Sequence, residues 1–205
     1  MGRQVEDREV GSERVVLTLF PDLKGDRRRD ILMAATELFA KKGYKHTSVR
    51  DIAESVGLLG GSLYHHIKSK EDLFVEVHGE ALRVAGQRVR EAVLAERDPW
   101  EKLRAACTMQ LKIQLDPESV TLPLMDLASV SPKLRERLVA QRDAFEQIYR
   151  EVVKDLPLDP DIDRNLYRLT LLTLLNGIGA WYQPGTQSPN DVAEQIFKIY
   201  RRAAT

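Results

Sequence analysis

The sequence contains a single cysteine, Cys107, and its acidic and basic residues balance to a formal net charge of zero. One cysteine excludes a disulfide within the chain and a cysteine-based zinc site, and it favours a reducing compartment. Long apolar runs are also missing: the longest, 169–182, is interrupted by Thr, Asn and Gly and is too short to cross a bilayer. The N-terminus has no apolar signal-peptide segment. We therefore expect a cytoplasmic protein that does not enter a membrane.

Strand patterns are absent as well, because no stretch alternates apolar and polar residues with period two. Signals for helix starts recur instead, as an N-cap residue followed by proline. These pairs are Asp98-Pro99, Ser131-Pro132, Asp159-Pro160 and Ser188-Pro189. With apolar periodicity they predict helices at 26–42, 69–96, 99–115, 132–154, 160–182 and 189–203, and a shorter one from Asp116-Pro117 to near Ser129. The expected fold is all-α, with about nine helices in two bundles.

The stretch from Thr47 to Leu73 reads as two short helices around a glycine turn. Val49, Ile52, Ala53 and Val56 have the spacing of one buried helix face, and Gly57 then breaks the pattern. A second segment, 59–67, carries few apolar residues and leaves a large face for a partner. Helix-turn-helix proteins lay such a helix in the major groove of DNA, whereas an ordinary corner between two helices would have the same pattern.

Positive charge gathers around this stretch. Residues 24–70 hold ten Lys and Arg against five Asp and Glu, whereas the flanking parts are net acidic. Ser69 and Asp72 have capping-box spacing, which places Lys70 at a helix N-terminus where it could help to hold a phosphate. Arg27, Arg28 and Arg29 open the first helix, where an external phosphate or simple solvation would offset their unfavourable position. This distribution favours binding to nucleic acid.

The residues from Ile31 to Phe74 resemble the tetracycline-repressor (TetR) family of bacterial transcriptional regulators. The matching runs are ILMAATELFAKKGYKHTSV, RDIAESVG and GSLYHHIKSKEDLF. The resemblance implies a homodimer that binds a palindromic operator in double-stranded DNA and is released by a small-molecule inducer. It also implies a helix-turn-helix domain at 25–70 and a ligand-binding and dimerisation domain at 71–205. Residues 1–24 are charged with a single apolar cluster at 15–20, which predicts a flexible extension; their net negative charge disfavours the alternative of a basic arm that reaches DNA.

The resemblance also assigns DNA contacts by position. In this reading Thr47 caps the second helix and binds a phosphate. The full set is Thr47, Ser48, Arg50, Gly60, Gly61, Ser62, Tyr64, His65 and Lys70. Leu59 stands where the family often has a capping Ser or Thr, and Gly60 stands where a basic residue is common. We expect no metal at His65-His66, since neighbours on a helix point about 100° apart; His65 would face DNA and His66 the helix interface.

The C-terminal part resembles family members that sense acyl-coenzyme A (acyl-CoA) thioesters. Asn176, Trp181, Tyr182 and Pro184 form the pattern N-x4-W-Y-x-P, followed by S-P-x-x-V-A. Gly177 and Gln183 depart from it, where Trp and Arg are frequent in the subgroup. The resemblance therefore implies an acyl-CoA effector and no other cofactor.

Residues of the middle helices are candidates for the effector pocket, although each apolar one also reads as core. They are Met109, Ile113, Leu122, Met125, Phe145, Tyr149, Arg168, Leu172 and Asn176. A buried Arg168 must be paired, either with a ligand carboxylate or phosphate or with a carboxylate of the protein. A second set is expected in the dimer interface: Leu171, Leu174, Leu175, Ile178 and Trp181, with Val192, Ile196 and Ile199.

The favoured function is a ligand-responsive DNA-binding repressor. Two alternatives come from other classes. A protein of the same fold could be controlled by protein partners, with no small-molecule inducer. An enzyme would need a catalytic constellation, but no nucleophile–base pair stands out by spacing, and Asp161 and Asp163 read as helix-start residues. We therefore expect no catalytic residue.

Overall fold

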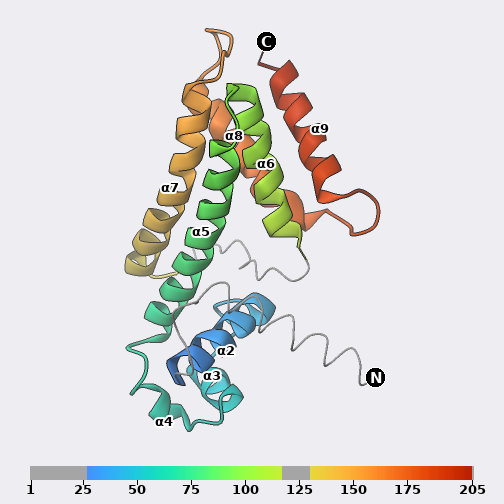
Figure 1. Ribbon diagram of the computed structural model, residues 1–205. Coiled ribbons are helices and arrows are strands. Elements are labelled where there is room, and N and C mark those ends of the chain that lie inside the picture. Colours follow the sequence, from blue (N-terminus) through green and yellow to red (C-terminus); the bar gives the residue numbers. More distant parts are fainter. Residues whose placement is uncertain (1–26, 117–129, 205) are drawn as a thin grey trace. The chain divides into compact units, whose positions relative to one another are not determined.

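The computed structural model describes residues 27–116 and 130–204, and within them every regular element is helical (Figure 1). The elements are α2 (Arg27–Lys42), α3 (Val49–Ser55), α4 (Gly60–Leu63), α5 (Lys70–Leu94), α6 (Pro99–Leu115), α7 (Pro132–Lys154), α8 (Arg164–Gly177), the 3-10 helix η2 (Ile178–Ala180) and α9 (Pro189–Arg202). The all-α prediction is confirmed. The predicted extension at 1–24 and the predicted helix at 116–129 lie outside the described residues. In the described part, no helix is long and apolar enough to span a bilayer.

The chain divides into two compact units. In the described part, the first unit comprises 27–84 and 130–141, and the second comprises 85–116 and 142–204. The division falls inside α5 and inside α7, so each of these two helices contributes residues to both units. The domain limits expected from the sequence, 25–70 and 71–205, remain a prediction.

The first unit is built around α2. Its buried side chains Ile31, Leu32, Ala35 and Phe39 meet apolar residues of α3, α4 and α5. Leu134 and Leu138 of α7 belong to the same core and are almost fully buried. The first three turns of α7 are therefore structural parts of the helix-turn-helix unit.

The second unit contains a larger core made by the remaining turns of α5 and α7 and by α6, α8 and α9. α6 packs along α9, and Trp100 and Phe197 meet edge to face at a centroid distance of 6.4 Å. Cys107 is fully buried here, and burial raises the pKa of its thiol to about 12. The thiol is therefore protonated and unreactive at neutral pH.

Local capping explains most helix starts. The side chains of Asp98, Ser131 and Ser188 each accept a backbone N–H from the first turn of the following helix, as predicted. The prediction for the helix after Asp159 was wrong. Asp159 accepts the N–H of Asp161 at 2.9 Å and closes a turn, and α8 begins after Asp163, whose carboxylate caps Leu166 N.

Candidate DNA-binding interface and effector site

The turn before α3 decides which residue of the Thr47-Ser48 pair caps the helix. Ser48 is the N-cap: its Oγ accepts from Asp51 N at 3.0 Å, and Asp51 accepts from Ser48 N at 2.7 Å. The predicted capping role of Thr47 is therefore wrong. Thr47 is 1% exposed, and its hydroxyl lies within hydrogen-bonding distance of the Gly43 and Leu38 carbonyls. Thr47 holds the turn closed from inside, whereas Ser48 lies on the surface.

The first helix of the motif carries exposed polar groups at its start. Arg50 is exposed and pairs with Glu54 one turn later at 2.6 Å. Hydrogen bonds from Ser48, with help from Lys42, lower the pKa of Asp51 to about 2. The capping box therefore stays intact throughout the physiological pH range. The start of α3 thus presents a serine hydroxyl and a guanidinium to solvent.

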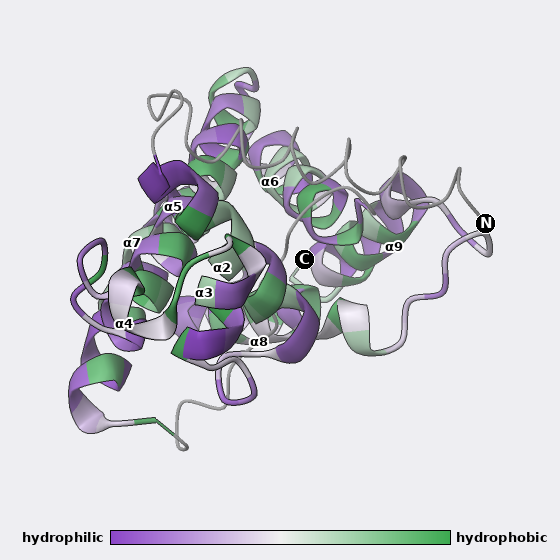
Figure 2. Cartoon of the chain, turned by 90° about the horizontal axis from the view of Figure 1, so that it is seen from below, coloured by the Kyte–Doolittle hydropathy of each residue, from purple (hydrophilic) through white to green (hydrophobic). Residues whose placement is uncertain are grey.

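The second helix of the motif, α4, is only four residues long and is shorter than the predicted segment at 59–67. Leu59 occupies its N-cap position without a side-chain hydrogen bond and is 81% exposed. The helix is nearly white in Figure 2, because Gly60, Gly61 and Ser62 are neither strongly polar nor apolar. Leu63 alone anchors it in the core.

Side chains beyond α4 complete its outer face. Tyr64 is 57% exposed and His65 is exposed, whereas His66 is half-buried, as expected for residues that face in different directions. In the described residues no group of three metal-ligating side chains occurs. The exposed tyrosine and histidine therefore add a polar and aromatic surface directly after α4.

Lys70 connects the start of α5 to the loop before α3. Its ammonium donates to the carbonyls of Tyr44 and Thr47 at 3.0 and 2.9 Å, and it lies 4.2 Å from the centroid of the Tyr44 ring. Burial lowers its pKa from the ordinary value. An ammonium has three N–H donors, so one remains for a phosphate. Lys70 therefore also positions the loop before α3, which the sequence did not indicate.

The arginines that open α2 bind the protein itself. Arg27 donates to the Val56 carbonyl at 2.7 Å, and Arg28 donates to the His66 carbonyl at 2.6 Å and pairs with Glu76. These bonds tie α2 to the C-cap of α3 and to the turn that follows α4. Neither of the two expected interpretations, a bound phosphate or simple solvation, included this internal role.

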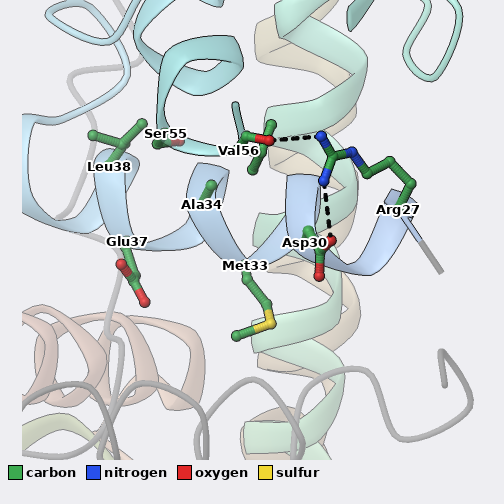
Figure 3. Close-up of a pocket in the computed structure, with 8 residues that line it drawn as sticks. All are labelled: Arg27, Asp30, Met33, Ala34, Glu37, Leu38, Ser55 and Val56. Carbon is green, nitrogen blue, oxygen red and sulfur yellow. Dashed lines mark hydrogen bonds and ion pairs between the residues drawn. The ribbon is translucent and has the colours of Figure 1, made fainter. Parts of the chain in front are cut away.

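A shallow hollow of about 450 Å³ lies on the first unit between α2 and the end of α3 (Figure 3). Met33, Ala34, Leu38 and Val56 supply apolar lining, while Asp30 and Glu37 place carboxylates at it. Arg27 also lines the hollow and pairs with Asp30 at 3.7 Å, so the lining has a net negative charge, which opposes the binding of an anionic ligand. This hollow is therefore a poor candidate for an acyl-CoA site.

The effector candidates of the second unit fall into two groups. Met109, Ile113 and Phe145 are partly buried and pack against the core, while Tyr149 and Leu172 are buried in it. Leu122 and Met125 lie outside the described residues. The buried cation is already paired: Arg168 donates to Glu146 at 2.6 Å, and Asn165 accepts its second amino group at 2.8 Å. The protein's own carboxylate is thus the partner of Arg168.

Asn176 belongs to an uncharged polar cluster with two glutamines that sequence reasoning missed. Its Oδ1 accepts from Gln110 Nε2 at 2.9 Å and from Gln114 Nε2 at 3.2 Å. The Tyr149 hydroxyl lies 2.5 Å from Gln110 Oε1 and 3.2 Å from the Ala106 carbonyl. Gln110 and Gln114 are four apart on α6, and this spacing in an otherwise apolar helix face was a usable signal.

Most residues expected in the dimer interface are instead core residues of the second unit. Five of them are at most 5% exposed within the single chain: Leu171, Leu175, Ile178, Val192 and Ile196. They cannot meet a second subunit, so that assignment was wrong. Leu174 is half-buried, and Trp181 and Ile199 are 56% and 61% exposed. Further apolar exposure on α8 comes from Leu166 and Leu169, at 61% and 41%.

These features define an all-α protein with a helix-turn-helix unit and a second helical unit that holds a buried polar cluster. Residues 31–77 match the family model of bacterial regulatory proteins of the tetR family. Residues 96–204, more than half of the chain, match the model of the tetracyclin repressor-like C-terminal domain. The chain therefore belongs to the tetR family and is a DNA-binding transcriptional repressor of this type.

Similar proteins agree with this assignment. The chain is 33% identical over 191 residues to the HTH-type transcriptional repressor KstR2 of Mycolicibacterium smegmatis. The aligned region covers 87% of this chain and 91% of that protein. Among solved structures, the ketosteroid transcriptional regulator KstR2 of Mycobacterium tuberculosis is 26% identical, with a TM-score of 0.65, over 89% of this chain and 97% of that one. The structure of AibR in complex with isovaleryl coenzyme A and operator DNA has a TM-score of 0.73 at 23% identity, over 85% of this chain and 97% of that one. At this identity the similarity establishes the shared fold and nothing more.

Proposed function

We propose that the chain represses transcription as a homodimer and is released from a palindromic operator by an acyl-CoA thioester. The operator-binding surface consists of the exposed residues Ser48, Arg50, Tyr64 and His65 with the spare N–H of Lys70. Two such surfaces about 34 Å apart would enter successive major grooves. The single observation that carries the DNA-binding part is this exposed polar surface on a helix-turn-helix whose core residues Ile52, Ala53 and Leu63 are fully buried.

The operator-binding surface is tested by measuring affinity against salt concentration. Tyr64→Ala and Lys70→Ala should each weaken binding on every DNA sequence, and Lys70→Ala should lower the salt slope by about one unit. Lys154→Ala, which removes an exposed lysine at the end of α7, serves as the control. Unchanged affinity in both variants would contradict the proposed docking geometry.

The homodimer is proposed to form through α8 and α9. Leu166 and Leu169 lie three residues apart on the outer face of α8, and Ile199 is exposed on α9. Burying this apolar face against its copy would give an isologous interface. Leu169→Asp should shift the sedimentation of the protein from dimer to monomer, whereas Leu94→Asp, at another exposed leucine, should not.

The acyl-CoA effector rests on the C-terminal pattern around Asn176 and on a buried polar cluster in which one acceptor has no partner among the described residues. The relative of known structure described as a ketosteroid transcriptional regulator supports a hydrophobic effector. Calorimetric titration with octanoyl-CoA, combined with an operator-release assay, tests the proposal. Binding that leaves operator affinity unchanged would contradict induction, since a ligand shifts a conformational equilibrium only by its differential affinity.

A further inference from the structure

The polar cluster of the second unit contains one acceptor that no described residue satisfies. Gln114 Oε1 is buried and has no hydrogen-bond partner within 27–116 and 130–204. The other amide atom of the same side chain is engaged, because Gln114 Nε2 donates to Asn176 at 3.2 Å. Leaving a buried acceptor unpaired costs about 1–3 kcal/mol. Such a cost is expected where a ligand supplies the missing donor.

Asn176 offers the complementary group beside it. Its Oδ1 already accepts from both Gln110 and Gln114, and among the described residues its amide nitrogen donates to no acceptor. The cluster thus presents an acceptor from Gln114 and a donor from Asn176. Tyr149 and Gln110 are 0% and 3% exposed and bond to each other, so they form the buried end of the cluster.

The charges around the cluster favour an uncharged ligand group. Gln110, Gln114 and Asn176 are neutral, and burial raises the pKa of Tyr149 well above its ordinary value, so this group is neutral as well. The buried cation of α8, Arg168, is already neutralised by Glu146. A ligand carboxylate placed here would be buried without a counter-charge, which is costly.

We propose that the effector carries a hydroxyl group on its acyl chain, which donates to Gln114 Oε1 and accepts from the Asn176 amide. A methylene at this place would leave the glutamine acceptor unpaired. A ketone oxygen could accept from Asn176 but has no hydrogen to give to Gln114. A hydroxyl is one small uncharged group that satisfies both. This inference rests on the proposed acyl-CoA effector and specifies the chemistry of its acyl part.

The test compares thioesters of one chain length by isothermal titration of the full-length protein. The probes are octanoyl-CoA, 3-oxooctanoyl-CoA and the 2-, 3- and 8-hydroxyoctanoyl-CoA thioesters. At least one hydroxylated thioester should bind about tenfold more tightly than octanoyl-CoA or the 3-oxo compound, because a site that keeps an unpaired polar group discriminates by at least this factor. Gln114→Leu should abolish this preference while octanoyl-CoA binds as well as before or better.

Gln87→Leu is the matched control, since Gln87 is exposed on α5 and its side chain bonds to Glu91 one turn later. It should keep the hydroxyl preference. If all thioesters bind the native protein equally, or if Gln114→Leu keeps the preference, the inference is wrong and the proposed function stands. If no thioester binds, the proposed effector class fails and the inference fails with it. The ligand series on the native protein decides the matter even where Gln114→Leu does not fold.

Discussion

At the residue scale, two buried tyrosines show that burial alone does not determine how much a hydroxyl contributes to stability. The Tyr149 hydroxyl lies within hydrogen-bonding distance of Gln110 and the Ala106 carbonyl. The Tyr167 hydroxyl is buried and has no partner in the part of the chain that the structure describes, while its ring meets Tyr200 edge to face at 5.3 Å. Desolvation raises the pKa of both phenols, so both are neutral in the folded protein.

The same substitution is expected to act oppositely at these two positions. Tyr149→Phe should lower the free energy of unfolding by about 1–3 kcal/mol, because Gln110 Oε1 loses its donor inside the core. Tyr167→Phe should leave stability unchanged or raise it slightly, since it removes an unpaired buried hydroxyl. Chemical denaturation of both variants measures the difference. Equal losses would mean that the Tyr167 hydroxyl has a partner in solution.

His78 is expected to make stability depend on pH. Its ring nitrogen bonds to Gln141 at 2.8 Å, and burial lowers its pKa below the ordinary 6.5. The unfolded chain therefore binds a proton at a higher pH than the folded one. The unfolding free energy should fall as the pH drops below about 6.5, and it should level off below the folded-state pKa. His78→Leu should remove this part of the slope in thermal unfolding between pH 5 and 8, and an unchanged slope would exclude His78 as its source.

At the element scale, α4, the short second helix of the motif, lacks the side-chain cap that α3 and α9 have. The starts of α3 and α9 are held by complete capping boxes, Ser48 with Asp51 and Ser188 with Asp191. Leu59 offers no such hydrogen bond, and Gly60 and Gly61 contribute flexible backbone at the next two positions. The helix is thus held mainly by the burial of Leu63 and by its flanking turns.

Leu59→Ser should stabilise α4 by about 0.5–2 kcal/mol, because serine can accept a backbone N–H of the first turn. The gain should appear as slower amide hydrogen exchange in residues 60–64. Leu94→Ser makes the same change at another exposed leucine, in the last turn of α5, where no N-terminal donors are available. If both variants exchange alike, the helix start is not limited by its missing cap.

At the scale of the whole molecule, α7 is shared by both units. Its early turns put Leu138 in the core of the first unit and bond Arg137 to Asp72 at 2.6 Å. Its later turns place Phe145 and Tyr149 at the candidate effector site. One continuous helix thus offers a physical route by which an effector could alter operator binding.

Coupling between the two sites must be reciprocal if this route operates. An effector that lowers operator affinity by a given factor must itself bind the operator complex more weakly by the same factor. Calorimetric titration of the effector, with and without operator DNA, measures this factor. Gln141→Leu, which removes the bonds of α7 to His78 and the Val75 carbonyl, should reduce the factor, whereas Gln147→Leu on the exposed face of α7 should not. Equal coupling in both variants would exclude this contact from the route.

The sequence by itself determined the helical class, the motif and most helix starts. Asp98 and Ser188 cap groups only two or three residues away, and Gly43 and Gly57 end helices with a positive φ that glycine adopts without strain. These interactions are local, so spacing along the chain is enough to predict them. The charge of the helix-turn-helix segment was readable for the same reason.

The tertiary structure decided which face meets which neighbour. Spacing could not tell that Thr47 points inward and Ser48 outward, because a shift of one residue preserves the local pattern. Spacing could not identify Glu146, 22 residues away, as the partner of Arg168. It also could not predict that Gln114 Oε1 has no partner among the described residues. It also could not show that Leu171 and Leu175 are covered by their own chain. Each of these features depends on side chains that come together from different helices. An apolar stripe in the sequence predicts that a helix face is buried, but it does not predict which residues bury it.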